Sequence, residues 1–450
     1  MGLSKKLVTN LSEQKNEPGW MTDFRLQALQ LFESMPLPSW GVDLKKVNFD
    51  DLTYYLKPAE QQWSSWSDVP DSIKETFESL GVPEAEKKFL AGVGAQYESE
   101  VVYKNLKEEW AKQGVIFVDT STGLREHEKL FKTYFSTIVK PHDNKFAALN
   151  AAVWSGGSFI FIPEGVHVEL PLQAYFRINS PKMGQFERTL IVAAPNSRVH
   201  YIEGCSAPVY QKGSLHSAVV EVIACAGSRV RYTTIQNWSS DVYNLVTKRA
   251  VAHEDAAVEW IDGNFGSQAT MKYPCIVLQG DRARGQLISV SVAGNGQHQD
   301  VGGKIIHQGK QTTSHIISKS ICRCGGVSTY RGLVTVEKTA ANAKSQVQCD
   351  ALLLDSRSVA LSKPNIIVNR HDSDVGHEAS VSTVDEEQLL YLQSRGFSVQ
   401  RARAMIVNGF IDLFVQELPM EYAVEINRLI ALELDPSMRF ANVQHSGRSG

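Results

Sequence analysis

The spacing of hydrophobic and polar positions changes twice along the chain. Over residues 1–145, apolar side chains recur mainly at helical intervals. Over 146–378, short β-branched runs alternate with Gly, Ser, Asn and Asp, and helical spacing nearly disappears. Helical spacing returns over 379–450, where Thr383 to Glu386 form a capping box. We therefore expect an N-terminal helical region, a β core and a C-terminal helical region. The helices expected in the outer regions cover 71–81, 83–114, 124–139, 386–396, 398–415 and 420–434.

The β core repeats itself about every thirty residues. Aligning its turns gives successive spacings of 31, 31, 28, 27, 30 and 30 residues. A period of this length without helices indicates a solenoid of stacked coils, a parallel β-helix. A β-sandwich or meander is the alternative, but its strands, spaced by about 8 to 12 residues, would not return one turn pattern near thirty. The aligned positions are Val168, Val199, Val230, Val258, Gly285, His315 and Ser345.

Composition narrows the class of protein. The chain has 450 residues, 43% of them hydrophobic, and its 46 basic and 49 acidic residues leave a charge of −3, so we expect neither nucleic-acid nor membrane binding. The richest apolar stretch, 404–415, is shorter than the roughly 18 residues of a membrane span, and the N-terminus shows no targeting segment. The six cysteines form neither a dense disulfide framework nor a zinc-binding CxxC pair. We expect a cytoplasmic protein with reduced thiols.

The repeat brings candidate chemistry together. Cys205 and Gln236 are 31 residues apart, whereas Cys349 and His377 are 28 apart and Glu378 follows directly. Positions one coil apart stack on the same face, so a thiol, an imidazole and a carboxylate are expected near the end of the solenoid, a set suited to iron or to a reactive thiolate. The alternative is ordinary: a lone strand cysteine is more often a small buried hydrophobe, and His377-Glu378 could be a surface pair.

The two candidate thiols are expected to be far apart. Cys205 and Cys349 are separated by 144 residues. That separation is five coils, or about 24 Å at about 4.8 Å per strand. Any transfer of sulfur between the two thiols therefore needs a passage lined by groups such as Gln236 or Arg177. No P-loop is present, so any ATP hydrolysis belongs to another chain, and no hydrolase triad is apparent. The pair Cys322 and Cys324 could chelate a metal or be incidental, and Cys225 and Cys275 are expected to be packing residues.

Several segments resemble one known family. YIEGCSAP, RYTTIQNW, NLVTKRA, CDALL, HEASVS and EEQLLYLQSRG, among others between about residues 18 and 434, closely resemble the SufB branch of the SufB/SufD iron-sulfur cluster assembly family of the SUF system. The resemblance implies a right-handed parallel β-helix flanked by helical regions. It also implies a scaffold function, a SufC-type ABC ATPase docked on the C-terminal helices, and pairing with SufD or a second copy. Sulfur would come from a cysteine desulfurase and clusters would pass to apo iron-sulfur proteins or a carrier.

The resemblance also assigns residues. Cys205 would accept sulfur as a persulfide, and Cys349, with Glu378 and His377, would hold a nascent cluster. ATP hydrolysis is expected in the SufC-type partner, so this chain is expected to be a scaffold and not an enzyme. The transient cluster is the expected cofactor; a reduced flavin is considered, but no motif specifies it. Positions that would line the sulfur path are Arg177, Asn179, Gln236, Trp238 and Lys248.

Two rival functions are open at this point. One is a SufD-like structural subunit, against which the presence of both Cys205 and Cys349 argues. The other is a polysaccharide-active β-helix enzyme, for which a secretion signal would be expected. The cysteine cluster found near the N-terminus of some family members is absent from this sequence.

Overall fold

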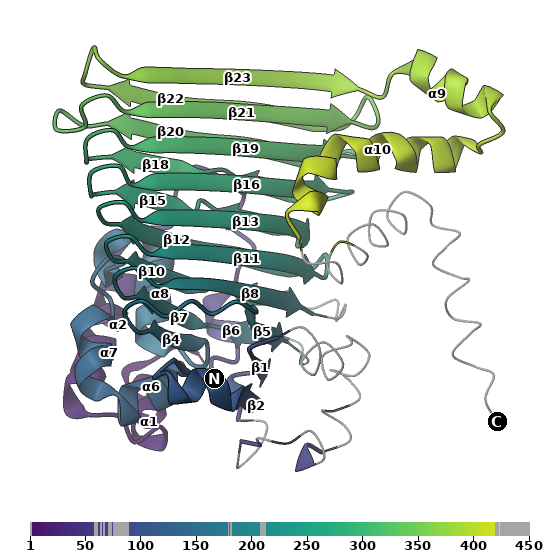
Figure 1. The fold of residues 1–450 in the computed structure, drawn as a ribbon. Helices are drawn as coiled ribbons and strands as arrows, with labels where there is room; N and C mark the ends of the chain where they lie inside the picture. Colours follow the sequence, from purple (N-terminus) through teal and green to yellow (C-terminus); the bar gives the residue numbers. More distant parts are fainter. Residues whose placement is uncertain are drawn as a thin grey trace.

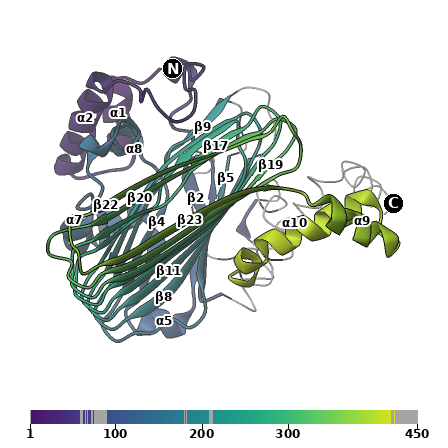
Figure 2. The same ribbon diagram turned by 90° about the horizontal axis from the view of Figure 1, so that it is seen from above.

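A computed structural model describes residues 2–57, 62, 63, 65, 68–70, 74, 90–178, 180, 182–207, 213–418 and 423. Two long, mostly parallel sheets face each other and are joined coil by coil into a flattened tube (Figures 1 and 2). The parallel β-helix predicted from the repeat is confirmed, with about 8 turns flanked by N- and C-terminal helices. Among the described residues, no helix is long and apolar enough to cross a membrane.

The first sheet carries the candidate thiols. It begins with an antiparallel pair and continues as parallel strands, one per coil. In spatial order its strands are β2 (Glu100–Leu106), β1 (Gly92–Tyr97), β5 (Leu172–Arg177), β8 (Arg198–Ser206), β11 (Arg229–Trp238), β13 (Ala257–Gly266), β16 (Arg284–Ala293), β19 (Thr313–Cys322), β21 (Lys344–Leu353) and β23 (Asp374–Thr383).

The second sheet closes the tube. Its strands are β3 (Ile116–Asp119), β4 (Ser158–Ile162), β6 (Gly184–Gln185), β7 (Arg188–Ala193), β9 (Ser214–His216), β10 (Val219–Ala224), β12 (Val242–Ala252), β14 (Ala269–Lys272), β15 (Cys275–Leu278), β17 (His298–Val301), β18 (Lys304–His307), β20 (Val327–Val336) and β22 (Val359–Val368). Side chains that alternate toward the interior of the tube form the largest buried cluster of the molecule.

The register of the first sheet explains the repeat and corrects it at one position. Val199, Val230, Val258 and Gly285 pair in succession, as predicted. Gly285 then pairs with Ser314, and Ser314 with Ser345, so the anchor at His315 is wrong by one residue. These two coils contain 29 and 31 residues, whereas the alignment assumed 30 for both. A shift of one residue matters because it turns a side chain to the opposite face of the sheet.

The same backbone turn recurs in six successive coils. In each coil one residue adopts a left-handed conformation with φ between 55° and 68°. This conformation suits Gly and is tolerated by Asn and Asp. Gly occupies one of the six positions, and Asn or Asp occupies three. Each turn sends the chain from the second sheet into the next strand of the first. The positions are Asn196, Gly227, Asp255, Arg282, Gln311 and Asn342.

The N-terminal region mixes helices with strands. Its elements are α1 (Lys5–Gln14), α2 (Gly19–Ser34), α5 (Glu108–Lys112), α6 (Thr120–Glu126), α7 (Glu128–Tyr134), α8 (Lys145–Val153), and the 3-10 turns η1 (Phe49–Asp51) and η3 (Pro141–Asp143). The helix predicted over 83–114 is wrong where β1 and β2 form a hairpin, because β1 pairs with β5 and so extends the first sheet. The helix predicted over 124–139 ends at Tyr134. The segment 71–81 lies outside the described residues except for Lys74.

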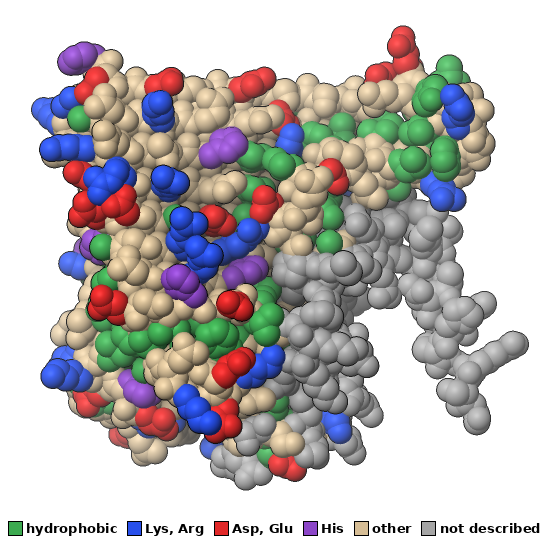
Figure 3. Space-filling model, viewed as in Figure 1, with side chains coloured by type: hydrophobic (Ala, Val, Ile, Leu, Met, Phe, Trp, Pro, Cys, Tyr) green, Lys and Arg blue, Asp and Glu red, His purple; other side chains and the backbone are tan. Residues whose placement is uncertain are grey.

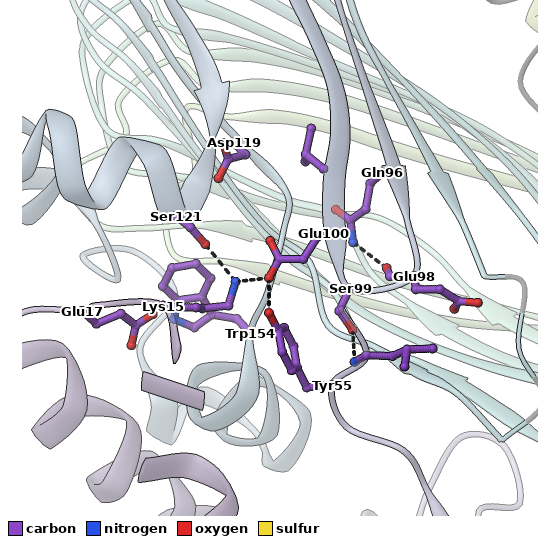
Figure 4. A network of polar contacts seen from close by, with 12 residues as sticks. Lys15, Glu17, Tyr55, Gln96, Glu98, Ser99, Glu100, Asp119, Ser121 and Trp154 are labelled. Atoms are coloured by element: carbon purple, nitrogen blue, oxygen red, sulfur yellow. Dashed lines mark hydrogen bonds and ion pairs between the residues drawn. The ribbon is translucent and has the colours of Figure 1, made fainter. Parts of the chain in front are cut away.

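A buried lysine joins the first helix to the first coil. The Lys15 Nζ lies 2.6 Å from Glu100 Oε1 on β2 and donates to Ser121 Oγ at 3.1 Å (Figure 4). Tyr55 Oη donates to the same Glu100 oxygen at 2.7 Å. Because the lysine side chain is only 4% exposed, losing Glu100 would leave a buried positive charge uncompensated. The N-terminal helices are thus fixed to the base of the solenoid.

Two of the three helices predicted in the C-terminal region are confirmed. α9 (Glu386–Ser394) and α10 (Val399–Gln416) follow β23 and lie beside the tube (Figures 1 and 2). α10 packs its buried residues, Val407, Ile411 and Phe414 among them, on the outer face of the first sheet. The helix predicted over 420–434 lies outside the described residues, apart from residue 423.

Candidate functional site

Two rows of buried polar side chains cross the interior of the solenoid along the first sheet. The first row starts at Cys205 and continues one strand at a time through Gln236, Asn264 and Ser291. The second row ends at Cys349 and consists of Glu203, Thr234, Asp262, Ser289, Ser318 and Cys349. The strands that carry the two thiols, β8 and β21, are five steps apart in the sheet, as the coil count predicted.

The Cys205 thiol is buried against a carboxylate. Its Sγ donates to Glu203 Oε1 at 3.6 Å, and Tyr232 Oη donates to the other carboxylate oxygen at 2.5 Å. Burial, and then the nearby Glu203 charge, raise the pKa of the Cys205 thiol well above its ordinary value. The thiol is therefore protonated in the resting protein, and a thiolate forms there only when the local charge changes.

Two buried lysines share one aspartate in the middle of the interior. Asp262 Oδ1 lies 3.3 Å from Lys248 Nζ and 3.2 Å from Lys272 Nζ. Burial lowers the pKa of Lys272 to about 8, although Asp262 opposes this shift. Lys248 was expected from the resemblance. Lys272 was missed because it comes from β14 in the second sheet, where no repeat had been aligned.

An amide and an imidazole complete this polar cluster. Gln236 Oε1 accepts from Asn244 Nδ2 at 2.8 Å, and Asn244 Oδ1 lies 2.7 Å from His216 Nδ1. The His216 ring lies 4.6 Å from the Trp238 ring, centroid to centroid. Burial alone would lower the pKa of His216, but the Glu187 carboxylate 2.8 Å away more than offsets it and raises that pKa. His216 and Asn244 are 28 residues apart and pair in register, so coil-length spacing is also the sequence signal for contacts within the second sheet.

The residues predicted to line the sulfur path do not all lie on the same side of the first sheet. Gln236, Trp238 and Lys248 are buried inside the tube. Arg177 pairs with Ser206, the residue after Cys205, and the Arg177 guanidinium donates to Ser206 Oγ at 3.0 Å. Because side chains alternate along a strand, Arg177 lies on the opposite face of the sheet from Cys205. Asn179 lies outside the described residues.

The Cys349 thiol lies in the last coils. Its Sγ is 3.1 Å from His377 Nε2 and 3.6 Å from Ser362 Oγ, and it lies 3.5 Å from the Glu378 carbonyl oxygen. Burial raises the pKa of Cys349, and the Ser362 hydrogen bond partly counteracts the shift. The structure thus brings the thiol and the imidazole together, as the spacing predicted.

Glu378 is adjacent but faces the other way. On β23, His377 pairs with Val347 and Glu378 with Gln348, so the carboxylate alternates to the face opposite Cys349. Within the described parts of the chain, no three His, Cys, Asp or Glu side chains form a group that could hold a metal ion. Cys349 and His377 are therefore a pair of potential ligands, and a bound metal would need further ligands from outside the pair.

Exposed apolar side chains surround this end of the molecule. In the last coil, Leu361, Ile366 and Val381 are 41–56% exposed. On the C-terminal helices, Leu390 and Tyr391 are more than half exposed, and hydrophobic side chains are visible along α9 and α10 (Figure 3). Large exposed apolar patches mark interaction surfaces in soluble proteins.

Comparison with known proteins agrees with this architecture. The family model described as the SufBD core domain of the SUF system for FeS cluster assembly matches residues 176–410, and the SufBD protein N-terminal region matches 9–174. The chain is 57% identical to the iron-sulfur cluster assembly protein SufB of Bacillus subtilis (strain 168), over 97% of this chain and 94% of that protein. It is 56% identical to an iron-sulfur cluster assembly SufBD family protein of Staphylococcus aureus (strain MRSA252), with the same coverage. The chain therefore belongs to the SufB/SufD family of iron-sulfur cluster assembly proteins.

Proposed function

We propose that this chain is a scaffold on which iron and sulfur are combined, with Cys205 as the sulfur acceptor and Cys349 as the assembly thiol. The observation that carries the proposal is that a polar row beginning at Cys205 and a second polar row ending at Cys349 run side by side inside one solenoid. The 57% identity to a SufB protein favours the scaffold over a SufD-like structural role.

Sulfur enters by thiol exchange. The Cys205 thiolate attacks the outer sulfur of a persulfide on a cysteine desulfurase system; a new S–S bond forms on Cys205 as the donor's S–S bond breaks, and the donor leaves as a thiolate. The raised pKa of Cys205 opposes ionisation, whereas the positive charges of Lys248 and Lys272 favour it. Lys248 and Lys272 therefore favour formation of the Cys205 thiolate through their positive charge, and they do not act as bases.

Sulfur then crosses the interior as a small released species. The residues that join Cys205 to Cys349 in the two rows are amides, hydroxyls and carboxylates, so stepwise exchange between thiols is not available along them. Two electrons from a reductant, either a thiol or a reduced flavin, convert the Cys205 persulfide into a thiolate and hydrosulfide. The amide and hydroxyl groups of the rows, together with the Lys248 and Lys272 ammonium groups beside Asp262, donate hydrogen bonds to this anion along a path of about 24 Å.

Iron and sulfide combine at Cys349 and His377. Both are established ligand types for iron, and the thiolate is the softer of the two. Glu378 joins them only if β23 changes its local conformation, and a SufD partner or second copy supplies the remaining ligands across the open end. A SufC-type ATPase binds the apolar surface of α9 and α10 and drives the opening of that interface; apo proteins or a carrier receive the cluster.

Anaerobic reconstitution with two sulfur sources tests the assignment. Cys205→Ser should lose nearly all cluster absorbance when sulfur comes from a cysteine desulfurase with cysteine, yet retain it with ferrous iron and free sulfide. Cys349→Ser should lose it with both sources, because the assembly thiol is missing. Cys225→Ser is the matched control, since this half-buried thiol lies outside both rows.

Normal cluster yield from Cys205→Ser with the desulfurase would remove the sulfur relay. A wild-type chain that forms no cluster with either source would instead indicate the structural-subunit role.

A further inference from the structure

A buried tyrosine lies near Cys349, at the end of the solenoid where the cluster is proposed to form. Tyr330 lies on β20 in the second sheet and is only 6% exposed. Its hydroxyl is buried and has no hydrogen-bond partner among the described residues. A buried hydroxyl without a hydrogen-bond partner destabilises the folded state, so its presence here needs an explanation.

Tyr330 is placed against both neighbours of the Cys349 thiol. Its ring lies nearly parallel to the His377 ring, with centroids 6.5 Å apart and planes 15° apart. On its other side Tyr330 pairs in register with Ser362, whose Oγ lies 3.6 Å from Cys349 Sγ. The phenol, the imidazole and the hydroxyl of Ser362 thus converge with the thiol on the same interior space.

A glycine leaves room for the phenol. A Cβ at Gly332 would lie 2.5 Å from the Tyr330 hydroxyl oxygen, so any larger residue would displace it. Gly332 is two residues further along β20 and therefore shares the interior face with Tyr330. The absence of a side chain at Gly332 therefore provides the space that the Tyr330 hydroxyl occupies inside the tube.

We propose that the Tyr330 hydroxyl donates a hydrogen bond to the sulfide of a cluster being assembled on Cys349, a proposal that rests on the scaffold function above. Within the described parts of the chain this donor has no acceptor, and an arriving sulfide supplies one. A tyrosine phenol keeps its proton at neutral pH, so Tyr330 acts as a donor and not as an iron ligand. Hydrogen bonds to cluster sulfur stabilise the more negative, reduced state.

Tyr330→Phe tests this because it removes only the hydroxyl and keeps the ring beside His377. After reconstitution with ferrous iron and sulfide, we expect the variant's absorbance to bleach about tenfold faster under a chelator, the effect of one hydrogen bond to a charged acceptor. Its reduction potential should become more negative. The thermal midpoint of the apo variant should be unchanged or higher, since an unpartnered hydroxyl has been removed, whereas a structural role predicts a lower midpoint.

Two further variants make the test decisive. Tyr54→Phe is the control, because the Tyr54 hydroxyl donates to Phe49 O at 2.6 Å in the N-terminal region; its bleaching rate and potential should match wild type. Gly332→Ala should reproduce the faster bleaching of Tyr330→Phe. Equal bleaching and equal potential in Tyr330→Phe and wild type would overturn the proposal while leaving the scaffold function intact. A phenolate-to-iron absorption band in wild type would also overturn it, and a wild type without any cluster would refute both.

Discussion

At the scale of single residues, the chemistry depends on burial as much as on identity. Cys205 and Cys349 are 3% and 4% exposed, and burial raises the pKa of both thiols. Burial therefore keeps both thiols protonated and unreactive in the resting protein. Entry of sulfur or iron has to be accompanied by loss of a proton from each sulfur.

This predicts a distinct pH dependence of alkylation. At pH 7 the folded protein should be modified by iodoacetamide at Cys324, which is exposed, far faster than at Cys349 or Cys205. The rate at Cys349 should still be rising above the ordinary thiol pKa of about 8.5, because its own pKa is higher. Peptide mass spectrometry over pH 6 to 10 measures this, and equal rates at Cys324 and Cys349 would contradict it.

The linkage to stability has a defined sign. Because the folded pKa of Cys349 lies above the unfolded value, the unfolded chain releases its proton at lower pH than the folded chain does. The favourable contribution is present below the unfolded pKa and is lost as pH rises through the folded pKa. Cys205 acts in the same direction.

Residue-scale prediction from the sequence succeeded along one sheet. Coil spacing paired Cys205 with Gln236 and brought His377 to Cys349. It missed Glu203, which is two residues from Cys205 in the sequence, because a single acidic residue in a strand gives no sign of which face it occupies. It also missed contacts between the two sheets, since these depend on how the tube is flattened.

At the scale of elements, the repeated turn is what makes the coils stack. Left-handed residues recur in six successive coils, and where the residue is neither Gly, Asn nor Asp the turn is strained. Gln311, with φ of 56°, is exposed and is such a position. Local backbone preference, and not side-chain contact, should therefore limit the stability of this turn.

Gln311→Gly is expected to stabilise the protein by roughly 0.5–1 kcal/mol, because glycine adopts this conformation without the steric cost. The shift in the urea midpoint measures it. Gly227→Ala, at the equivalent turn three coils earlier, is the matched reverse change. Its Cβ would lie 2.3 Å from Asn196 Oδ1, so this substitution should destabilise the protein. A destabilised Gln311→Gly would show that the glutamine side chain is needed.

The hairpin of β1 and β2 shows where element prediction fails. Its sequence mixes helix formers with Gly92 and Gly94, and the helical period over 83–114 looked continuous. The strand conformation is decided by β5, which lies about eighty residues later and offers an unpaired edge. A nonlocal partner of this kind leaves no trace in local periodicity.

At the scale of the whole molecule, the solenoid has one closed and one open end. The N-terminal helices and the β1–β2 hairpin lie at its base, and β22 and β23 form the last described coil at the other end (Figure 1). That coil exposes backbone edges and apolar side chains. Exposed edges of this kind invite pairing with another chain. The pair Cys349 and His377 lies close to that end, which is consistent with ligands arriving from a partner.

Val381→Lys should therefore weaken pairing, with a second copy or with a SufD partner, by roughly a hundredfold in Kd, because an unpaired charge would be buried in the interface. Val381 is 56% exposed in the single chain, so its stability should hardly change. Leu37→Lys, at an exposed apolar residue of the N-terminal region, is the control. Light scattering after gel filtration measures the assembly; undiminished pairing of Val381→Lys would place the interface elsewhere.

The sequence by itself determined the repeat, the parallel β-helix and the stacking of residues one coil apart, because strand period and coil length are local properties that survive without knowledge of partners. Only the tertiary structure decided which side chains face inward together from the two sheets, that Glu378 points away from Cys349, and that Tyr330 meets His377. These contacts depend on how the two sheets are aligned with each other and on the exact register of each coil. A register shift of one residue turns a side chain from the inside of the tube to the outside.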